Sequence, residues 1–312
     1  MVVGLVIGCS APAPALAAEP DVLCTVTDPR LSEASGLAVD GSRLLMVNDD
    51  GSSLEVYVLD RSCRVTSVIS APVDPYDVED LALAADGTLW LADIGDNSLA
   101  RDTVALHALA ADGRSSLFRY SYVDGLHDAE ALLLDAGGRP VVVTKELSGR
   151  AGVYTASEAA PRVLSRVGSL ALTPTGTPGG PAGGIGQVLV TGAALSPDGL
   201  FAVVQTYTDA YLYAVSDGDV VAALASAPVR VALPVSPQGE AIAFDSNGRD
   251  LLVTSEGTPF DVTVVPVPGS LPAPASHVGA LSAGRSVGVN LAIAGLVAAA
   301  LVGTYGVVRR RG

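Results

Sequence analysis

Three glutamates open apolar segments at equivalent places along the chain, and together they could perform chemistry. They are Glu79, Glu130 and Glu240, each followed by four apolar or small residues, or by one acidic and three apolar residues. Carboxylates that converge in a confined space do not all stay ionised unless a cation joins them. Calcium is a hard cation that prefers oxygen ligands. We therefore predict that these glutamates hold Ca²⁺.

Further acidic residues follow the second apolar segment of two repeated units. Asp49 lies in an Asp-Asp-Gly sequence, and Asp93 and Asp96 lie in an Asp-x-x-Asp-Asn sequence. Both sequences look like short calcium loops, although neither has the spacing of an EF-hand. Acidic residues are also common in turns for backbone reasons alone. These three aspartates are therefore weaker candidate ligands.

The glutamates have two alternative roles. They could accept hydrogen bonds from backbone amides of neighbouring segments and so serve the architecture, because structural networks also gather carboxylates. They could also form an open acidic surface that recognises a cationic ligand, with Lys145 and Arg101 as local counter-charges. The sequence alone leaves all three roles open.

Catalytic candidates are few. His127 and Asp128 directly precede the Glu130 segment, and either could move protons as a general acid or base. The alternative for His127 is an ordinary solvated loop residue, and His107 is expected on the surface of a strand. The sequence contains no H-E-x-x-H or Walker motif.

The chain is strongly acidic, with 33 Asp and Glu against 18 Lys and Arg and a formal net charge of −15. This charge disfavours nucleic-acid binding, which requires positive charge to replace counterions. It suits metal ions or cationic ligands instead.

Five repeated units position these residues. They start at residues 35, 79, 130, 191 and 240, and each opens with two short apolar strands joined by a tight turn that contains glycine. Two further strands follow in most units, and a four-stranded unit of ~40–50 residues is a propeller blade. We predict an all-β protein, a β-propeller of five four-stranded blades over residues 20–267. The first strand of each blade lines the centre, so the glutamates should face one acidic funnel. A sixth blade within residues 158–190 is the alternative, but residues 173–186 are rich in Gly, Pro and Thr and favour a loop.

The fifth unit lacks a fourth strand, and residues 22–27 precede the first unit without a blade of their own. We predict that this N-terminal strand completes the last blade and closes the ring, which removes exposed edges. Closure would bring Cys24 beside the start of the outer strand at Cys63. This predicts a Cys24–Cys63 disulfide, with two separate thiols as the alternative.

Both ends of the chain suggest export and anchoring. Residues 1–19 resemble a signal-peptide leader, or a lipobox in which Cys9 is lipidated. Residues 287–308 are apolar and long enough to cross ~30 Å of hydrocarbon. The arginines in residues 309–312 favour a cytoplasmic tail, which places the propeller outside. Residues 268–286 are expected to form a Pro/Ala/Ser-rich stalk that connects the propeller to a C-terminal transmembrane helix.

The repeats resemble those of extracytoplasmic bacterial β-propellers of the WD-repeat-like, NHL-like, gluconolactonase-like and phytase-like group. The resemblance covers about residues 22–267 and rests on three sequences: Val-Glu-Asp-Leu-Ala at residues 78–82, Ala-Asp-Ile-Gly-Asp-Asn at residues 92–97, and Ser-Pro-Asp-Gly at residues 196–199. Members of this group include enzymes, binding modules and scaffolds, so the resemblance implies a fold and not a function.

The prediction for function is a membrane-tethered binding or scaffold module rather than an enzyme. Its acidic funnel, with or without Ca²⁺, would bind a protein or another cell-surface ligand of unknown identity. The alternative is a metal-dependent hydrolase of phosphate esters or lactones, the activities that the resemblance suggests. In that case Glu79, Glu130 and Glu240 would hold the metal, and His127 or Asp128 would move protons.

Overall fold

The computed structural model describes residues 19–181, 183–269 and 271, and these residues are mostly β-strand. The predicted transmembrane helix, the basic tail, Cys9 and nearly all of the leader and stalk lie outside the described residues. Within the described part, no helix is both long enough and apolar enough to cross a membrane.

The first and third sheets each contain four consecutive antiparallel strands. The strands of the first sheet are β2 (Ala34–Asp40), β3 (Arg43–Asn48), β4 (Leu54–Leu59) and β5 (Val65–Ala71). The strands of the third are β14 (Val190–Leu195), β15 (Phe201–Thr206), β16 (Asp209–Ala214) and β17 (Val229–Ala232). Short helices lie in the connections: η1 (Pro29–Leu31), η2 (Gly183–Ile185) and α1 (Val220–Leu224).

The second sheet contains eight strands, where the repeats predicted two separate groups of four. One group is β6 (Val78–Leu83), β7 (Leu89–Asp93), β8 (Val104–Leu109) and β9 (Ser115–Tyr122). The other group is β10 (Ala129–Leu134), β11 (Pro140–Thr144), β12 (Gly152–Ser157) and β13 (Ala160–Ser169). The two groups join because β9 and β13 pair in parallel, Ser121 with Val163 and Tyr122 with Leu164.

The fourth sheet combines both ends of the described chain. Its strands are β18 (Gly239–Phe244), β19 (Leu251–Ser255), β20 (Phe260–Val265) and the N-terminal β1 (Asp21–Val26). β1 pairs antiparallel with β20, so the N-terminal strand completes the last sheet as predicted. The disulfide Cys24–Cys63 is also confirmed, and it links β1 to the turn before β5.

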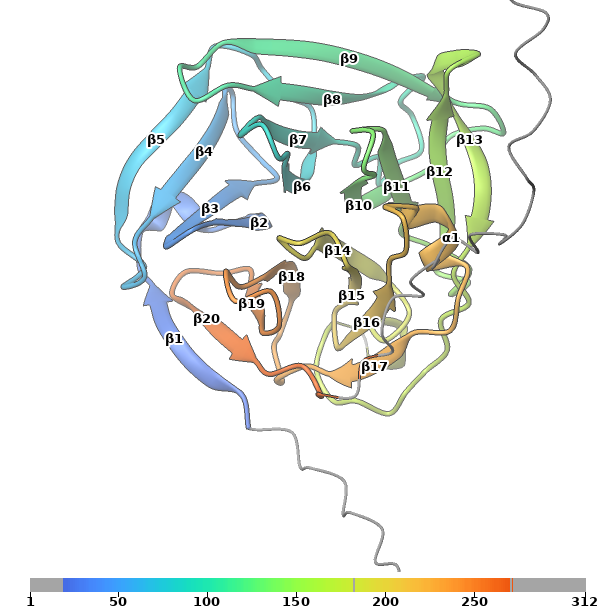
Figure 1. The fold of residues 1–312 in the computed structure, drawn as a ribbon. Coiled ribbons are helices and arrows are strands. Elements are labelled where there is room, and N and C mark those ends of the chain that lie inside the picture. Colours follow the sequence, from blue (N-terminus) through green and yellow to red (C-terminus); the bar gives the residue numbers. More distant parts are fainter. Residues whose placement is uncertain (1–18, 182, 270, 272–312) are drawn as a thin grey trace, which may run out of the picture. The chain divides into compact units, whose positions relative to one another are not determined.

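The first strands of the repeats gather around the centre of this unit (Figure 1). β2 contacts β6, β6 contacts β10, β10 contacts β14, β14 contacts β18, and β18 contacts β2. Apolar clusters fill the space between neighbouring sheets; one of them packs Leu37 and Leu44 of the first sheet against Leu252 and Val262 of the fourth. This circle of first strands explains how residues far apart in sequence reach one central site.

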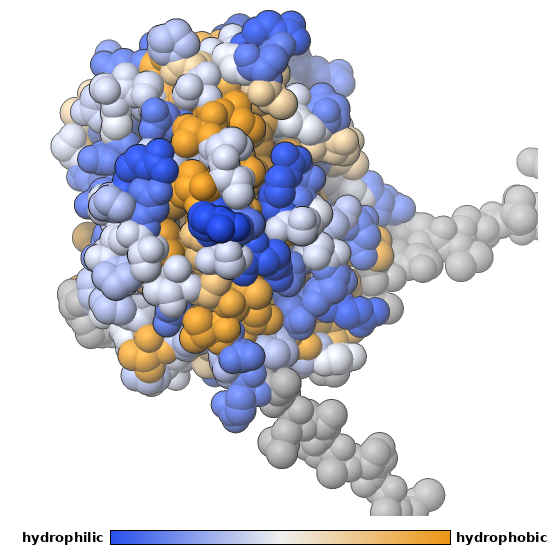
Figure 2. Space-filling model, turned by 90° about the vertical axis from the view of Figure 1, so that its left-hand side faces the viewer, coloured by the Kyte–Doolittle hydropathy of each residue, from blue (hydrophilic) through white to orange (hydrophobic). Residues whose placement is uncertain are grey.

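The outermost strands face solvent on one side. Figure 2 shows the side of the unit that carries β5, where apolar surface alternates with hydrophilic surface. Val65, Val68 and Ile69 of β5 are partly buried and pack onto the clusters below, whereas Thr66 and Ser67 are exposed. The outer layer is therefore amphipathic, as expected for an edge strand in water.

Candidate functional site

The three predicted glutamates occupy a shared backbone irregularity at the start of the first strands. Each first strand contains a β-bulge, where its pairing with the second strand skips one or two residues. The skipped residues are Ser35 in β2, Glu79 in β6, Glu130 in β10, Thr191 in β14, and Glu240 and Ala241 in β18. A β-bulge turns a side chain away from its regular direction and often lies next to a functional site. The repeats thus place equivalent residues at equivalent bulges.

The loops that surround these bulges lie on one face of the propeller unit, which we call the funnel face. The amide of Gly95, after β7, donates to the carbonyl of Asp77, before β6, at 3.2 Å. In the same way the amide of Lys145 donates to the carbonyl of Asp128 at 2.9 Å. Loops that leave second strands are therefore bonded to loops that lead into first strands.

Glu79, Asp128 and Glu130 come together on this face, and we call them the central group. One carboxylate oxygen from each lies within 4.8 Å of the other two. Glu79 is 5% exposed and Glu130 is 2% exposed, whereas Asp128 is partly exposed. Two of the three predicted glutamates and one catalytic candidate thus share a site.

Asp77 adds a fourth carboxylate beside the central group. A Cβ atom built on Gly95 would lie 2.3 Å from Oε1 of Glu79 and 2.4 Å from Oδ2 of Asp77. The two carboxylates therefore close over Gly95, and any larger residue there would displace them. Sequence reasoning missed Asp77, although it lies directly before the motif that contains Glu79.

Lys145 supplies positive charge next to the central group. Its Nζ donates to Oε1 of Glu130 and lies 5.2 Å from the centroid of the Tyr207 ring. Glu240 is 3% exposed, and within the described residues its Oε2 has no hydrogen-bond partner. Glu240 is not part of the central group, but its charge acts on both Glu130 and Lys145.

Burial dominates the electrostatics of the site. Burial, together with the charge of Glu130, raises the pKa values of Glu79 and Glu240 well above the usual range. Burial raises the pKa of Glu130 to about 7 even though Lys145 opposes the shift. Burial also raises the pKa of Asp128. Protons therefore compete with any cation for these oxygens near neutral pH.

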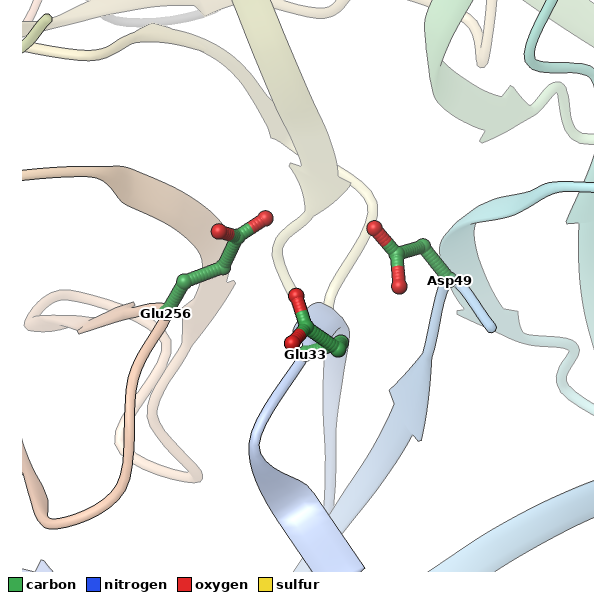
Figure 3. Close-up of side chains that lie close together, drawn as sticks. All are labelled: Glu33, Asp49 and Glu256. Carbon is green, nitrogen blue, oxygen red and sulfur yellow. The ribbon is translucent and has the colours of Figure 1, made fainter. Parts of the chain in front are cut away.

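A second set of carboxylates, which we call the seam group, lies where the first and fourth sheets meet. Glu33, Asp49 and Glu256 each place an oxygen within 4.8 Å of the others (Figure 3). Burial, then the charges of Glu256 and Glu33, raise the pKa of Asp49 to about 7. The side-chain amide of Gln238 donates to Oε2 of Glu256. Asp49 was a predicted candidate, whereas Glu33 lies before the first repeat and was missed.

Asp93 holds the loop that carries Asp77. It is 4% exposed, and its oxygens accept from the backbone amides of Tyr76 at 3.2 Å and Asp77 at 3.1 Å. The same carboxylate bonds Arg101 at 2.7 Å and Nε2 of His107 at 3.1 Å. His107 is buried, so its expected surface position was wrong. The hydrogen bond to Asp93 provides a buried partner for the polar ring.

Asp96 has a similar supporting arrangement. Its side chain accepts from the amides of Ala100 at 2.8 Å and Arg101 at 2.9 Å, and its own amide donates to Asp128 at 2.8 Å. Neither Asp93 nor Asp96 belongs to the central or the seam group. Both fix the loops that position the central group.

The architectural role that we considered for the glutamates is performed by a residue that sequence reasoning missed. Asp80 is 1% exposed and accepts from the amides of Leu81 at 2.8 Å, Leu132 at 2.8 Å and Ala193 at 3.3 Å. It thereby ties β6 to β10 and β14. The signal was present in the repeats, because the corresponding position elsewhere is always Gly or Ala: Gly36, Ala131, Gly192 and Ala241.

His127 lies in a hydrogen-bonded aromatic cluster. Its Nε2 is 3.1 Å from Oδ1 of Asp124 and 2.9 Å from the hydroxyl of Tyr154. Its Nδ1 is 3.6 Å from Oε1 of Glu146, and the Tyr122 ring packs edge-on with a centroid distance of 5.0 Å. The bonds of His127 are therefore made to this cluster and not to the central group.

Comparison with known proteins finds similar solved structures but no family. No family model and no curated protein matches the sequence. Among solved structures, a luciferin-regenerating enzyme is 15% identical, covers 80% of this chain and 96% of its own, and has a TM-score of 0.46. A gluconolactonase from Xanthomonas campestris is 16% identical, covers 85% and 90%, and has a TM-score of 0.43. A soluble aldose sugar dehydrogenase from Escherichia coli is 10% identical, covers 79% and 99%, and has a TM-score of 0.45.

The structural neighbours are β-propeller proteins, which agrees with the resemblance in the repeats. Their names cover enzymes and, in a nidogen–laminin complex, binding proteins. At these identities and TM-scores they assign no activity to this chain.

Proposed function

We propose that this protein is a binding module whose funnel face takes up a divalent cation, with Ca²⁺ as the expected ion. The convergence of Glu79, Asp128 and Glu130 carries the proposal. Oxygens that each lie ~2.3–2.6 Å from one Ca²⁺ are at most ~5 Å apart. The three carboxylate oxygens of the central group all lie within 4.8 Å of one another, so they are close enough to share one ion. The donor set consists of carboxylate oxygens, which suits a hard cation.

A bound cation would make this face a docking site. It would relieve the repulsion among the buried carboxylates and leave coordination positions for an oxygen of a ligand. The ligand in this proposal is a protein or another cell-surface molecule that presents such an oxygen.

We further propose the arrangement of the whole chain. The five contacting first strands support five four-stranded blades, with the β9–β13 pairing as a local join between two of them. The apolar residues 287–308 and the arginines after them support a membrane anchor with the propeller outside. The Cys24–Cys63 disulfide is consistent with an oxidising compartment.

Calorimetric titration of the purified full-length chain with Ca²⁺ tests the proposal. We compare the wild type with the central variant Glu79→Gln/Asp128→Asn/Glu130→Gln. The matched control, Glu33→Gln/Asp49→Asn/Glu256→Gln, removes the same number and types of carboxylates from the seam group. Binding should persist in the control and disappear in the central variant. Unchanged binding by the central variant would show that the cation site lies elsewhere.

One observation favours a second function, a metal-dependent hydrolase. Asp128 belongs to the central group and is the partly exposed member of it, so its carboxylate could move a proton for a substrate bound at the cation. Hydrolysis of p-nitrophenyl phosphate and of a δ-lactone, each with added Ca²⁺, tests this function. Turnover that depends on Ca²⁺ and is lost in Asp128→Asn would support it. If neither compound is hydrolysed, the hydrolase function is refuted and the binding module remains the proposed function.

A further inference from the structure

Lys145 occupies an unusual position for the only lysine in the chain. Its side chain is 15% exposed, and its ammonium group lies between Glu130 and the ring of Tyr207. Ammonium groups are strongly hydrated, so a lysine is seldom withdrawn from water without a compensating charge. Glu130 provides that charge.

The charge of Lys145 reaches far across the funnel face. It favours the ionised form, and so opposes the rise in pKa, of six carboxyl groups: Asp77, Glu79, Asp128, Glu130, Glu240 and Glu256. These groups include the whole central group and one member of the seam group. Lys145 therefore acts on the same oxygens that a bound metal ion would neutralise.

We propose that Lys145 is a tethered cation that competes with external cations for the central group and thereby sets their affinity. The inference rests on the proposed cation site. Without an external ion, the ammonium neutralises Glu130. A divalent ion brings twice the charge, so it can take the Glu130 oxygen from the ammonium.

Glu240 gives the displaced ammonium an alternative acceptor. Its carboxylate is buried, its Oε2 has no hydrogen-bond partner within the described residues, and its charge already acts on Lys145. An ammonium group has three N–H donors, so Lys145 can bond Glu240 after it leaves Glu130. Glu240 thus offers Lys145 an acceptor outside the central group, an oxygen that has no partner in the described part of the chain.

The competition should restrict the site to weak binding. Calcium sites of extracellular modules have dissociation constants of ~10⁻⁴–10⁻³ M, in keeping with the calcium concentration outside cells. Removal of the tethered charge should shift this site to tighter binding. The sign is informative, because loss of a residue that merely supports the site would weaken binding instead.

Calorimetry with Ca²⁺ on the full-length chain tests this inference with Lys145→Met and Lys145→Arg, at about pH 9 so that protons compete less with the cation for the carboxylates. Methionine keeps much of the length and removes the charge, whereas arginine retains the charge. We expect the dissociation constant to fall at least tenfold in Lys145→Met and to stay within about threefold of the wild type in Lys145→Arg. Equal or weaker binding by Lys145→Met, or equally tight binding by both variants, would overturn the inference.

The same experiment separates this inference from the proposed function. If the wild type does not bind Ca²⁺ but Lys145→Met does, the competition is supported and the native calcium site is wrong. If both bind equally, the calcium site stands and the competition is wrong. If neither binds, both proposals fail. Lys145→Met also leaves Glu130 buried without its partner, so its thermal unfolding is followed in parallel. If it unfolds without Ca²⁺, Ca²⁺ must restore folding, and failure to do so counts against the inference.

A measurement on the unmutated protein gives an independent result. Because the sequence contains one lysine, a chain labelled with ¹⁵N-lysine has a single side-chain ammonium signal. Saturation with Ca²⁺ should shift this signal as the ammonium moves from Glu130 to Glu240. A signal that stays unchanged at saturating Ca²⁺ would contradict displacement.

Discussion

Replacement of Asp80 by alanine should strongly destabilise the fold. Asp80 is buried at the centre and accepts hydrogen bonds from three backbone amides, those of Leu81, Leu132 and Ala193. A buried amide that loses its acceptor costs about 1–3 kcal/mol, so three would cost about 3–9 kcal/mol. Removal of a buried carboxyl, whose pKa burial raises to about 7, recovers part of this cost. We therefore expect the free energy of unfolding to fall by about 3–4 kcal/mol, near the lower end of that range.

Urea denaturation measures this loss, and the same sheet offers a matched control. Asp86 is exposed and accepts from the amide of Thr88 at 2.9 Å, a bond that water can replace. Asp86→Ala should therefore change stability by less than about 1 kcal/mol. Asp80→Asn keeps one acceptor oxygen and should lie between the wild type and Asp80→Ala. If Asp80→Ala were as stable as Asp86→Ala, the assignment of Asp80 as the central tie between strands would be wrong.

Three further predictions concern the pH dependence of stability, the close packing at Gly95 and the Cys24–Cys63 disulfide. Glu130 has a pKa raised to about 7, so its contribution to stability is full below its unfolded value of 4.5 and is lost as pH rises through 7. Without added cation, urea denaturation should therefore give lower stability at pH 8 than at pH 5, and no such fall would contradict the assigned burial. Gly95→Ala should displace Glu79 and weaken Ca²⁺ binding, measured by calorimetry, at least tenfold. Gly184→Ala is the control, because a Cβ atom at Gly184 meets nothing within 4 Å, and it should leave Ca²⁺ binding unchanged. Equal effects of the two substitutions would refute the steric argument. Reduction of Cys24–Cys63, a separation of 39 residues, should lower stability by about 2–4 kcal/mol in urea, and an unchanged transition midpoint would show that the bond adds nothing.

The repeats allowed most of the fold to be predicted, because the turn signals are local. The glycines of the tight turns adopt the left-handed backbone that such turns require, for example φ 84° at Gly87 and 67° at Gly248. The unpaired N-terminal segment and the incomplete last repeat together predicted the pairing of β1 with β20. The parallel pairing of β9 with β13 was not predictable, because it depends on how two outer strands meet in space.

The candidate site was predicted only in part, because adjacent residues on a strand point to opposite faces. Glu79 and Asp80 have similar chemistry, yet the bulge directs Glu79 to the central group while Asp80 bonds the backbone of neighbouring strands. The sequence grouped Glu240 with Glu79 and Glu130 by its position in the repeat. The structure places Asp128 in that group instead, because the loop that leads into β10 brings the Asp128 carboxylate close to that of Glu79.

Anomalous diffraction from crystals grown with Ca²⁺, at a wavelength where calcium scatters, tests the central claim most directly. A peak should lie about 2.3–2.6 Å from carboxylate oxygens of Glu79, Asp128 and Glu130. Absence of a peak there, or a peak only among Glu33, Asp49 and Glu256, would contradict the assignment of the central group as the cation site.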